Sequence, residues 1–196
     1  MASAPSKENV LIEAAPKSVK MVVAGGFGVG KTTFVGTISE VAPLRTEAKM
    51  TEASLGIDDT SKVQSKTTTT VAMDFGKVTV AEDLVMYLFG TPGQDRFGFM
   101  WNDLVEGALG SIVLVDTRRL DDCYDAVDYF EQRNLPFIVA MNEFDKDHKP
   151  PVDAVRYAMN IPDHVPIVTC DARDKDSVKS VLLVLLELLL KGVQTP

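Results

Sequence analysis

A glycine-rich segment near the start of the chain has the residue types that bind phosphate groups. Residues 25–32 read Gly-Gly-Phe-Gly-Val-Gly-Lys-Thr, which matches the phosphate-loop pattern GxxxxGK(S/T). Glycines let the backbone curl until several N–H groups point at one phosphate, and the N-terminus of the following helix adds positive charge. A turn without a ligand is the competing interpretation, but the position between an apolar strand and a helix argues against it. The residues expected to contact a nucleotide here are Gly25, Phe27, Gly28, Val29, Gly30, Lys31, Thr32 and Thr33.

Three side chains of this segment have expected roles in phosphate chemistry. Lys31 should neutralise the β- and γ-phosphates as a point charge, and the Thr32 hydroxyl should ligate Mg²⁺. Thr33 can add a hydroxyl near the α-phosphate. The expected cofactors are therefore a nucleoside phosphate and Mg²⁺.

A second motif indicates which base the nucleotide carries. Residues 142–145 read Asn-Glu-Phe-Asp and follow an apolar run. A carboxylate at Asp145 can accept hydrogen bonds from N1–H and the 2-amino group of guanine, and adenine offers no such pair of donors. An NxxD pattern alone is common, but its place about 110 residues after the phosphate loop, at the end of an expected parallel strand, strengthens it. We expect Asn142 and Asp145 to bind guanine, with Cys170, Asp171 and Ala172 beside them and the N–H of Ala172 meeting guanine O6.

These motifs require a sheet that brings strand ends together. Apolar segments alternate with helical ones, which predicts an α/β fold of the P-loop NTPase class with a six-stranded mixed sheet flanked by helices. Strands are expected at residues 19–24, 71–80, 84–89, 111–116, 137–142 and 165–169, and helices at residues 31–41, 101–109, 123–133, 152–159 and 177–191. Because three residues separate the second and third strands, these two should form an antiparallel edge hairpin, and the others should be parallel. No regular pattern is expected between residues 43 and 69, and a loop of that length is usually functional.

Composition and charge exclude several classes of protein. The chain has 196 residues, 45% of them hydrophobic, and 20 Lys and Arg against 28 Asp and Glu give a net charge of −8. That balance predicts one folded domain at residues 18–196 after a flexible tail at residues 1–17, with no nucleic-acid partner. No apolar run reaches the roughly 20 residues of a transmembrane segment. Two isolated cysteines and two isolated histidines predict neither a zinc site nor a disulfide framework, so we expect a reduced, cytoplasmic protein.

With these motifs in place, residues 18–191 resemble the small Ras-like GTPases. More narrowly, the chain is similar to the bacterial members of the gliding-motility (Mgl) and actinobacterial conservon type. The resemblance implies a Ras-like G domain that cycles between GDP and GTP, hydrolyses GTP slowly and acts as a molecular switch in bacterial signalling. It also implies a roadblock-type regulatory protein and a sensor-kinase complex as partners, through which alone the protein would reach a membrane.

The resemblance assigns two segments that sense the γ-phosphate. Thr70 would ligate Mg²⁺ in the GTP state, although its neighbours at residues 67–69 are also threonines and leave the register open. In the segment Gly90-Thr91-Pro92-Gly93-Gln94, the N–H of Gly93 would bind the γ-phosphate. Gln94 would be the catalytic residue that orients the attacking water.

The chain departs from the family pattern at a position that concerns the metal. Gly90 stands where most of the family has an aspartate that holds Mg²⁺ through water. Without that carboxylate, Mg²⁺ and nucleotide should be held loosely, and Gly90→Asp should tighten them. The residues that could instead supply the missing carboxylate are Asp74, Asp58 and Asp59.

Two further departures concern the base and the activation of hydrolysis. Glu143 replaces the lysine that usually braces the phosphate loop and covers the base, and Phe27 stands where Ras has a glycine. The bulk of Phe27 would crowd an arginine inserted by a partner. An arginine from the same chain is conceivable, with Arg96 and Arg45 as candidates.

Two other functions remain open on the sequence. The same phosphate loop could serve an ATP-dependent kinase or an ATPase, although Asn142 and Asp145 favour guanine. The chain could also be a scaffold that binds nucleotide without hydrolysing it, an alternative that Gly90 keeps open.

Overall fold

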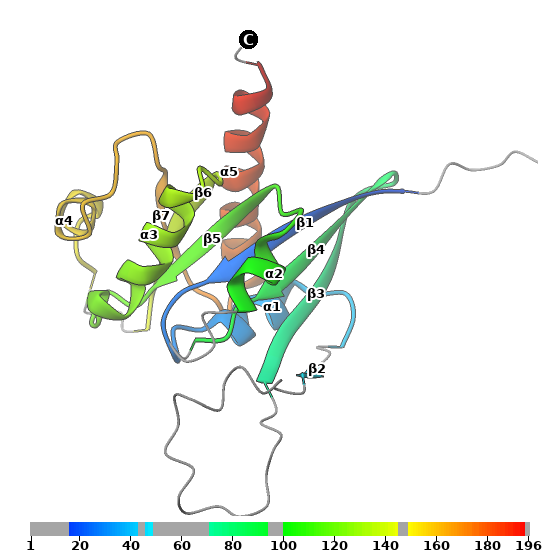
Figure 1. Cartoon of the computed structure of the whole chain (residues 1–196), viewed down its shortest axis with the longest axis horizontal. Coiled ribbons are helices and arrows are strands. Elements are labelled where there is room, and N and C mark those ends of the chain that lie inside the picture. The colour runs from blue at the N-terminus through cyan, green and yellow to red at the C-terminus, as the bar shows by residue number, and fades with distance from the viewer. Residues whose placement is uncertain (1–15, 43–45, 49–70, 94–99, 145–148, 195–196) are drawn as a thin grey trace, which may run out of the picture.

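The computed structural model describes residues 16–42, 46–48, 71–93, 100–144 and 149–194. Within these residues one seven-stranded sheet forms the centre of the molecule (Figure 1). Its strands are β1 (Lys17–Ala24), β2 (Thr46–Ala48), β3 (Val71–Ala81), β4 (Leu84–Gly90), β5 (Gly110–Val115), β6 (Phe137–Asn142) and β7 (Ile167–Cys170). They lie in the order β2-β3-β4-β1-β5-β6-β7.

The sheet confirms the predicted α/β class and its mixed character. β1 pairs in parallel with β4 and β5, β5 with β6, and β6 with β7, while β3 and β4 form the antiparallel hairpin. The six predicted strands are all present. The seventh, β2, is antiparallel to the outer edge of β3 and lies in a segment for which no regular structure was expected.

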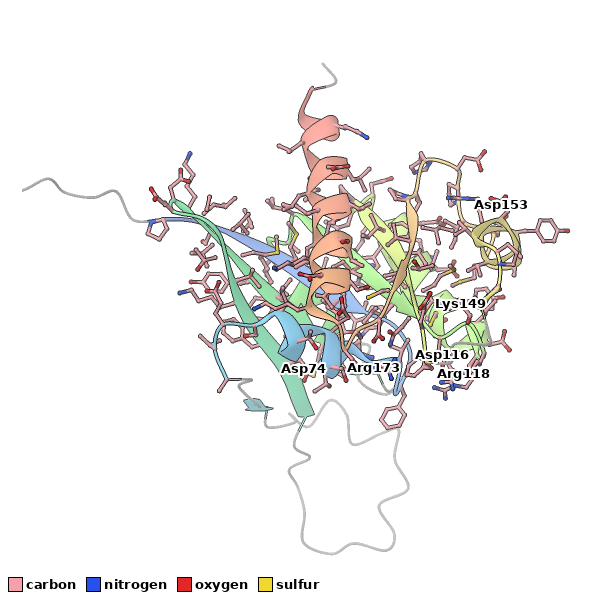
Figure 2. All side chains as sticks on the ribbon, turned by 180° about the vertical axis from the view of Figure 1, so that it is seen from behind. Asp74, Asp116, Arg118, Lys149, Asp153 and Arg173 are labelled. Carbon is pink, nitrogen blue, oxygen red and sulfur yellow. The ribbon has the colours of Figure 1, made fainter. Side chains whose placement is uncertain are left out.

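Helices cover both faces of the sheet, as predicted, with several different end points. The helices are α1 (Lys31–Ile38), α2 (Trp101–Val105), η3 (Leu120–Cys123, a 3-10 helix), α3 (Tyr124–Gln132), α4 (Val152–Ala158) and α5 (Lys175–Gln194). Figure 1 shows α3 in front of the sheet, and Figure 2, from the opposite side, shows α5 in front. Most helices are shorter than expected, whereas α5 begins earlier and ends later.

Alternate residues of β1 divide the apolar interior into two cores. Met21 and Val23 pack with α1 and α5, while Val22 and Ala24 pack with α3 and α4. Such a central strand, covered on both faces, is apolar along its length because neither face meets water. The long helix α5 turns one face to the core, where Leu185 is fully buried, whereas Leu183 is 58% exposed. In the described part of the chain, no helix has the length and apolar character needed to span a membrane.

The order of strands determines where a ligand can bind. The parallel strands β1, β4, β5, β6 and β7 all end at the same edge, so the loops that follow them meet there. In α/β proteins, ligands bind at the carboxyl ends of the parallel strands.

Candidate nucleotide-binding site

The phosphate loop connects the end of β1 at Ala24 to the start of α1 at Lys31. Its backbone has positive φ angles at Gly25 (134°), Gly28 (73°) and Gly30 (103°), a conformation that side-chain-bearing residues rarely adopt. At Gly30 a Cβ atom would also lie 2.5 Å from Nδ2 of Asn142. The glycines of the motif are therefore required by the shape of the loop and by a close approach to the base motif.

Lys31 lies inside this loop. Its Nζ donates to the carbonyl oxygens of Gly25 and Gly26, each at 2.7 Å, and the residue is only 7% exposed. Burial lowers the pKa of Lys31 to about 8, against smaller raising effects of Cys123 and Asp74. Because this ammonium group has lost most of its contact with water, a bound anion would stabilise its charge strongly.

Gly93 lies directly against this ammonium group. A Cβ atom at Gly93 would be 2.6 Å from Nζ of Lys31 and 2.9 Å from Cα of Phe27. The segment after β4 thus contacts the phosphate loop at Lys31. The sequence analysis predicts that Lys31 and Gly93 both face the terminal phosphate. Gln94 and Thr70 lie outside the described residues, as do Asp145, Arg45 and Arg96.

A carboxylate stands beside the expected metal ligand. Thr32 Oγ1 donates to Asp74 Oδ2 at 2.7 Å. Asp74 lies on β3 opposite Gly90 of β4, and a Cβ atom at Gly90 would be 2.9 Å from Asp74 Cβ. Asp74, one of the three residues named as a substitute for the missing carboxylate, therefore lies beside Thr32. How firmly Mg²⁺ is held there stays a prediction. Asp58 and Asp59 lie outside the described residues.

The donors at this point suit a hard divalent cation. A hydroxyl and a carboxylate are the oxygen ligands that Mg²⁺ prefers, together with water and phosphate oxygens. Among the described residues there is no group of three or more His, Cys, Asp or Glu side chains that could hold a metal by itself. Thr32 and Asp74 would therefore hold Mg²⁺ with the help of the nucleotide, where the ion offsets phosphate charge.

Asn142 joins three segments of the site. Its Nδ2 donates to the carbonyl oxygen of Val29 at 2.8 Å, and its Oδ1 accepts from the N–H of Ala172 at 3.0 Å. The residue is 6% exposed, so both bonds are shielded from water. The Ala172 N–H that the sequence assigned to guanine O6 bonds to Asn142 in this structure.

The other expected base-side residues have mainly structural partners. Cys170 is buried, which raises the pKa of its thiol to about 12, and its carbonyl oxygen accepts from the N–H of Glu143 at 2.7 Å. Asp171 accepts from Nε and Nη2 of Arg173 at 2.8 and 2.9 Å, and these bonds hold the pKa of the Asp171 carboxyl below its usual range. Glu143, in place of the usual lysine, pairs with Lys149 at 2.8 Å.

Sequence reasoning missed a charged cluster after β5. Asp116 is 2% exposed and accepts from Nε and Nη2 of Arg118 at 2.9 and 2.8 Å. Arg119 Nη2 donates to the carbonyl oxygen of Phe27 in the phosphate loop at 3.2 Å. Figure 2 shows Asp116 and Arg118 toward the same end of the molecule as Asp74 and Arg173. The feature of the sequence that could have indicated this cluster is the run of polar residues after a buried strand, at the edge of the sheet where the other site segments meet.

The phosphate-loop residues that are expected to contact nucleotide differ in exposure. Phe27 is 65% exposed, whereas Val29 is buried. Thr33 is exposed on the first turn of α1. The structure thus brings the phosphate loop, Gly93, Asp74, Asn142 and the segment 170–172 to one edge of the sheet.

Comparison with known proteins agrees with this arrangement. A family described as "Conserved hypothetical ATP binding protein" matches residues 23–192. An uncharacterized protein of Methanocaldococcus jannaschii is 30% identical over 129 residues, which are 65% of this chain and 71% of that protein. In the FeoB G-domain from Methanococcus jannaschii, 99% of the domain superimposes on 89% of this chain with a TM-score of 0.59 and 13% identity, a likeness of fold. The chain therefore has the fold of a nucleotide-binding P-loop NTPase, as predicted.

Asp74→Asn should weaken the hold on Mg²⁺, because the substitution removes the negative charge but keeps the shape of the side chain. Loss of such a partner typically costs about 10–100-fold in metal affinity. Dissociation of fluorescent GDP, followed across a Mg²⁺ titration, should therefore need that much more Mg²⁺ to be slowed. The structure reverses the sequence-based expectation for Gly90→Asp: a Cβ atom there would lie 2.9 Å from Cβ of Asp74 and displace that carboxylate, so this substitution should weaken retention as well.

Asp128→Asn provides the matched control, since Asp128 is exposed on α3, a helix that contributes no residue to the metal site. Mg²⁺ titration curves that coincide for the wild type and Asp74→Asn would show that Asp74 has no part in holding the metal.

Lys31 should make nucleotide affinity depend on pH. Bound phosphates favour the charged ammonium, so the pKa of Lys31 in the complex lies above the value of about 8 in the free protein. Affinity is then constant below that pH, where Lys31 is charged in both states, and falls by up to about ten-fold per pH unit above it. Equilibrium titration with fluorescent GDP measures this, with Lys179→Gln on the exposed part of α5 as the control. Affinity that stays constant to about one pH unit above that value contradicts the assignment.

Proposed function

This chain belongs to the family described as "Conserved hypothetical ATP binding protein", and from this premise we propose that it is a guanine-nucleotide switch with slow GTPase activity. The nucleotides would be GDP and GTP, bound with Mg²⁺. The proposal is more specific than the family description in its base and in its role.

The observation that carries the proposal is the position of Asn142. Its side chain is bonded to Val29 of the phosphate loop and to Ala172 of the segment after β7. The sequence Asn-Glu-Phe-Asp thus starts at the wall of the phosphate site, and Asp145 follows in the chain. A carboxylate that accepts from two donors of the base selects guanine, since adenine leaves it without partners.

The side chains of the site support a division of labour in hydrolysis. Lys31 would neutralise the phosphates, and the N–H of Gly93 would donate to the γ-phosphate beside it. Gln94 would orient the water whose oxygen attacks the γ-phosphorus as the bond to the β-phosphate oxygen breaks. Mg²⁺, when bound, would supply charge compensation at the phosphates.

A switch also needs partners that read its two states. We extend the proposal to a bacterial, cytoplasmic signalling role with a roadblock-type regulator and a sensor-kinase complex, as the sequence resemblance implies. The exposed ring of Phe27 supports regulation that differs from Ras, because it stands on the phosphate loop where an arginine from a partner would enter. The proposed partners are tested separately, by comparing which proteins bind to the GDP-loaded and to the GTP-loaded protein.

Asp145→Asn should change the preferred base from guanine to xanthine. Asparagine offers one donor and one acceptor, and xanthine has an oxygen where guanine has its amino group. The ratio of XDP to GDP affinity should rise by about 10²-fold or more, measured by competition against a fluorescent nucleotide. Asp153→Asn, at the start of α4, is the control. A ratio that does not rise would place the base pocket elsewhere.

Gln94→Leu should leave GTP affinity unchanged and slow hydrolysis by about ten-fold or more, because the amide acts on the attacking water and not on the ground state. Single-turnover phosphate release from bound GTP measures the rate. Hydrolysis at the wild-type rate would mean that another group positions the water. A wild type that binds GTP and releases no phosphate would favour the scaffold function.

A further inference from the structure

Two neighbouring arginines after β5 contact two different loops of the site. Arg119 Nη2 donates to the carbonyl oxygen of Phe27 in the phosphate loop at 3.2 Å. The guanidinium carbon of Arg118 lies 4.4 Å from the centre of the Phe144 ring, in the segment that carries the base motif. A planar cation at this distance from a ring is attracted to its face.

One buried carboxylate holds both arginines. Asp116 accepts from Nε and Nη2 of Arg118 at 2.9 and 2.8 Å, in the paired geometry that only arginine offers. Its Oδ2 also lies 3.6 Å from Nη2 of Arg119, and Nη1 of the same arginine pairs with Asp122 Oδ2 at 3.3 Å. Because Asp116 is 2% exposed and follows a central strand, its charge requires these partners and fixes their position.

The contacts on either side of this group belong to ligand-binding segments. Phe144 directly precedes Asp145 in the sequence, and it lies two residues after Asn142. On the other side, Phe27 and Gly28 belong to the phosphate loop, and a Cβ atom at Gly28 would lie 3.8 Å from Nη2 of Arg119. Each of the two segments is therefore connected to the shared carboxylate through one arginine.

We propose that Asp116, Arg118 and Arg119 form an arginine bridge, in which Arg118 positions the base segment for guanine selection and Arg119 positions the phosphate loop for retention of the diphosphate. The inference rests on the proposed function, since it assigns these roles toward a guanine nucleotide in the same site. All three are positioning residues that act through Phe144 and Phe27.

The test compares GDP with IDP, whose base lacks the 2-amino group. Arg118→Lys keeps the charge but loses the paired bonds and the flat face, so it should lower the ratio of GDP to IDP affinity by about three- to ten-fold. Arg119→Ala should speed dissociation of both nucleotides by a similar three- to ten-fold and leave their ratio unchanged. Asp116→Asn should show both effects.

Controls separate positioning from a loss of folding. Arg133→Lys and Arg133→Ala remove an arginine that stacks on Tyr129 at 3.8 Å, outside the site, and should change neither quantity. Phe144→Leu keeps an apolar side chain and should reproduce the lowered ratio of Arg118→Lys. Thermal unfolding of each nucleotide-free variant shows whether it is folded. A general destabilisation would not change the GDP to IDP affinity ratio in the Arg118 variant alone and the dissociation rates in the Arg119 variant alone.

The outcomes are distinguishable from failure of the proposed function. An unchanged GDP to IDP ratio in both Arg118→Lys and Phe144→Leu overturns the role of Arg118. A wild-type dissociation rate in Arg119→Ala overturns the role of Arg119. If the wild type binds ADP in preference to GDP, the proposed function and the guanine-selecting role of Arg118 both fail, and dissociation of ADP from Arg119→Ala then decides the Arg119 role alone.

Discussion

The site depends on the two shielded hydrogen bonds of the Asn142 amide. One joins the end of β6 to the phosphate loop at Val29, and the other joins it to the segment after β7 at Ala172. A buried amide that loses a partner is costly, so these bonds hold three loops in one arrangement. Gly30 allows the approach, because any side chain there would collide with Asn142.

Much of the fold could be predicted because it follows from local patterns. The six strands and the phosphate loop are encoded by apolar runs and by the spacing of glycines, and each was placed within a few residues. Asp74 could only be listed among three candidates, since its contact with Thr32 depends on the register of the β3–β4 hairpin. A shift of one residue in that register would turn Asp74 to the other face of the sheet. The short β2 was missed because three residues carry no pattern and pair only where β3 offers an edge.

The charged side chains of the site meet partners that lie far from them in the sequence. The carboxylate near Thr32 comes from β3 although β4 has Gly90 at the matching place. Arg118 and Arg119 were missed because their partners, Phe144 and Phe27, are distant in the chain and meet only after the sheet has formed. Meanwhile Lys31 uses two loop carbonyls as partners in the free protein, which keeps its ammonium group where phosphates would bind.

The proposed selection of guanine by this phosphate site is tested most directly by equilibrium titration of the wild-type protein with fluorescent GDP and with fluorescent ADP at saturating Mg²⁺. A base site that offers a carboxylate to two donors should bind GDP at least about 100-fold more tightly than ADP. Affinity for ADP equal to or greater than that for GDP would contradict a guanine-selecting site.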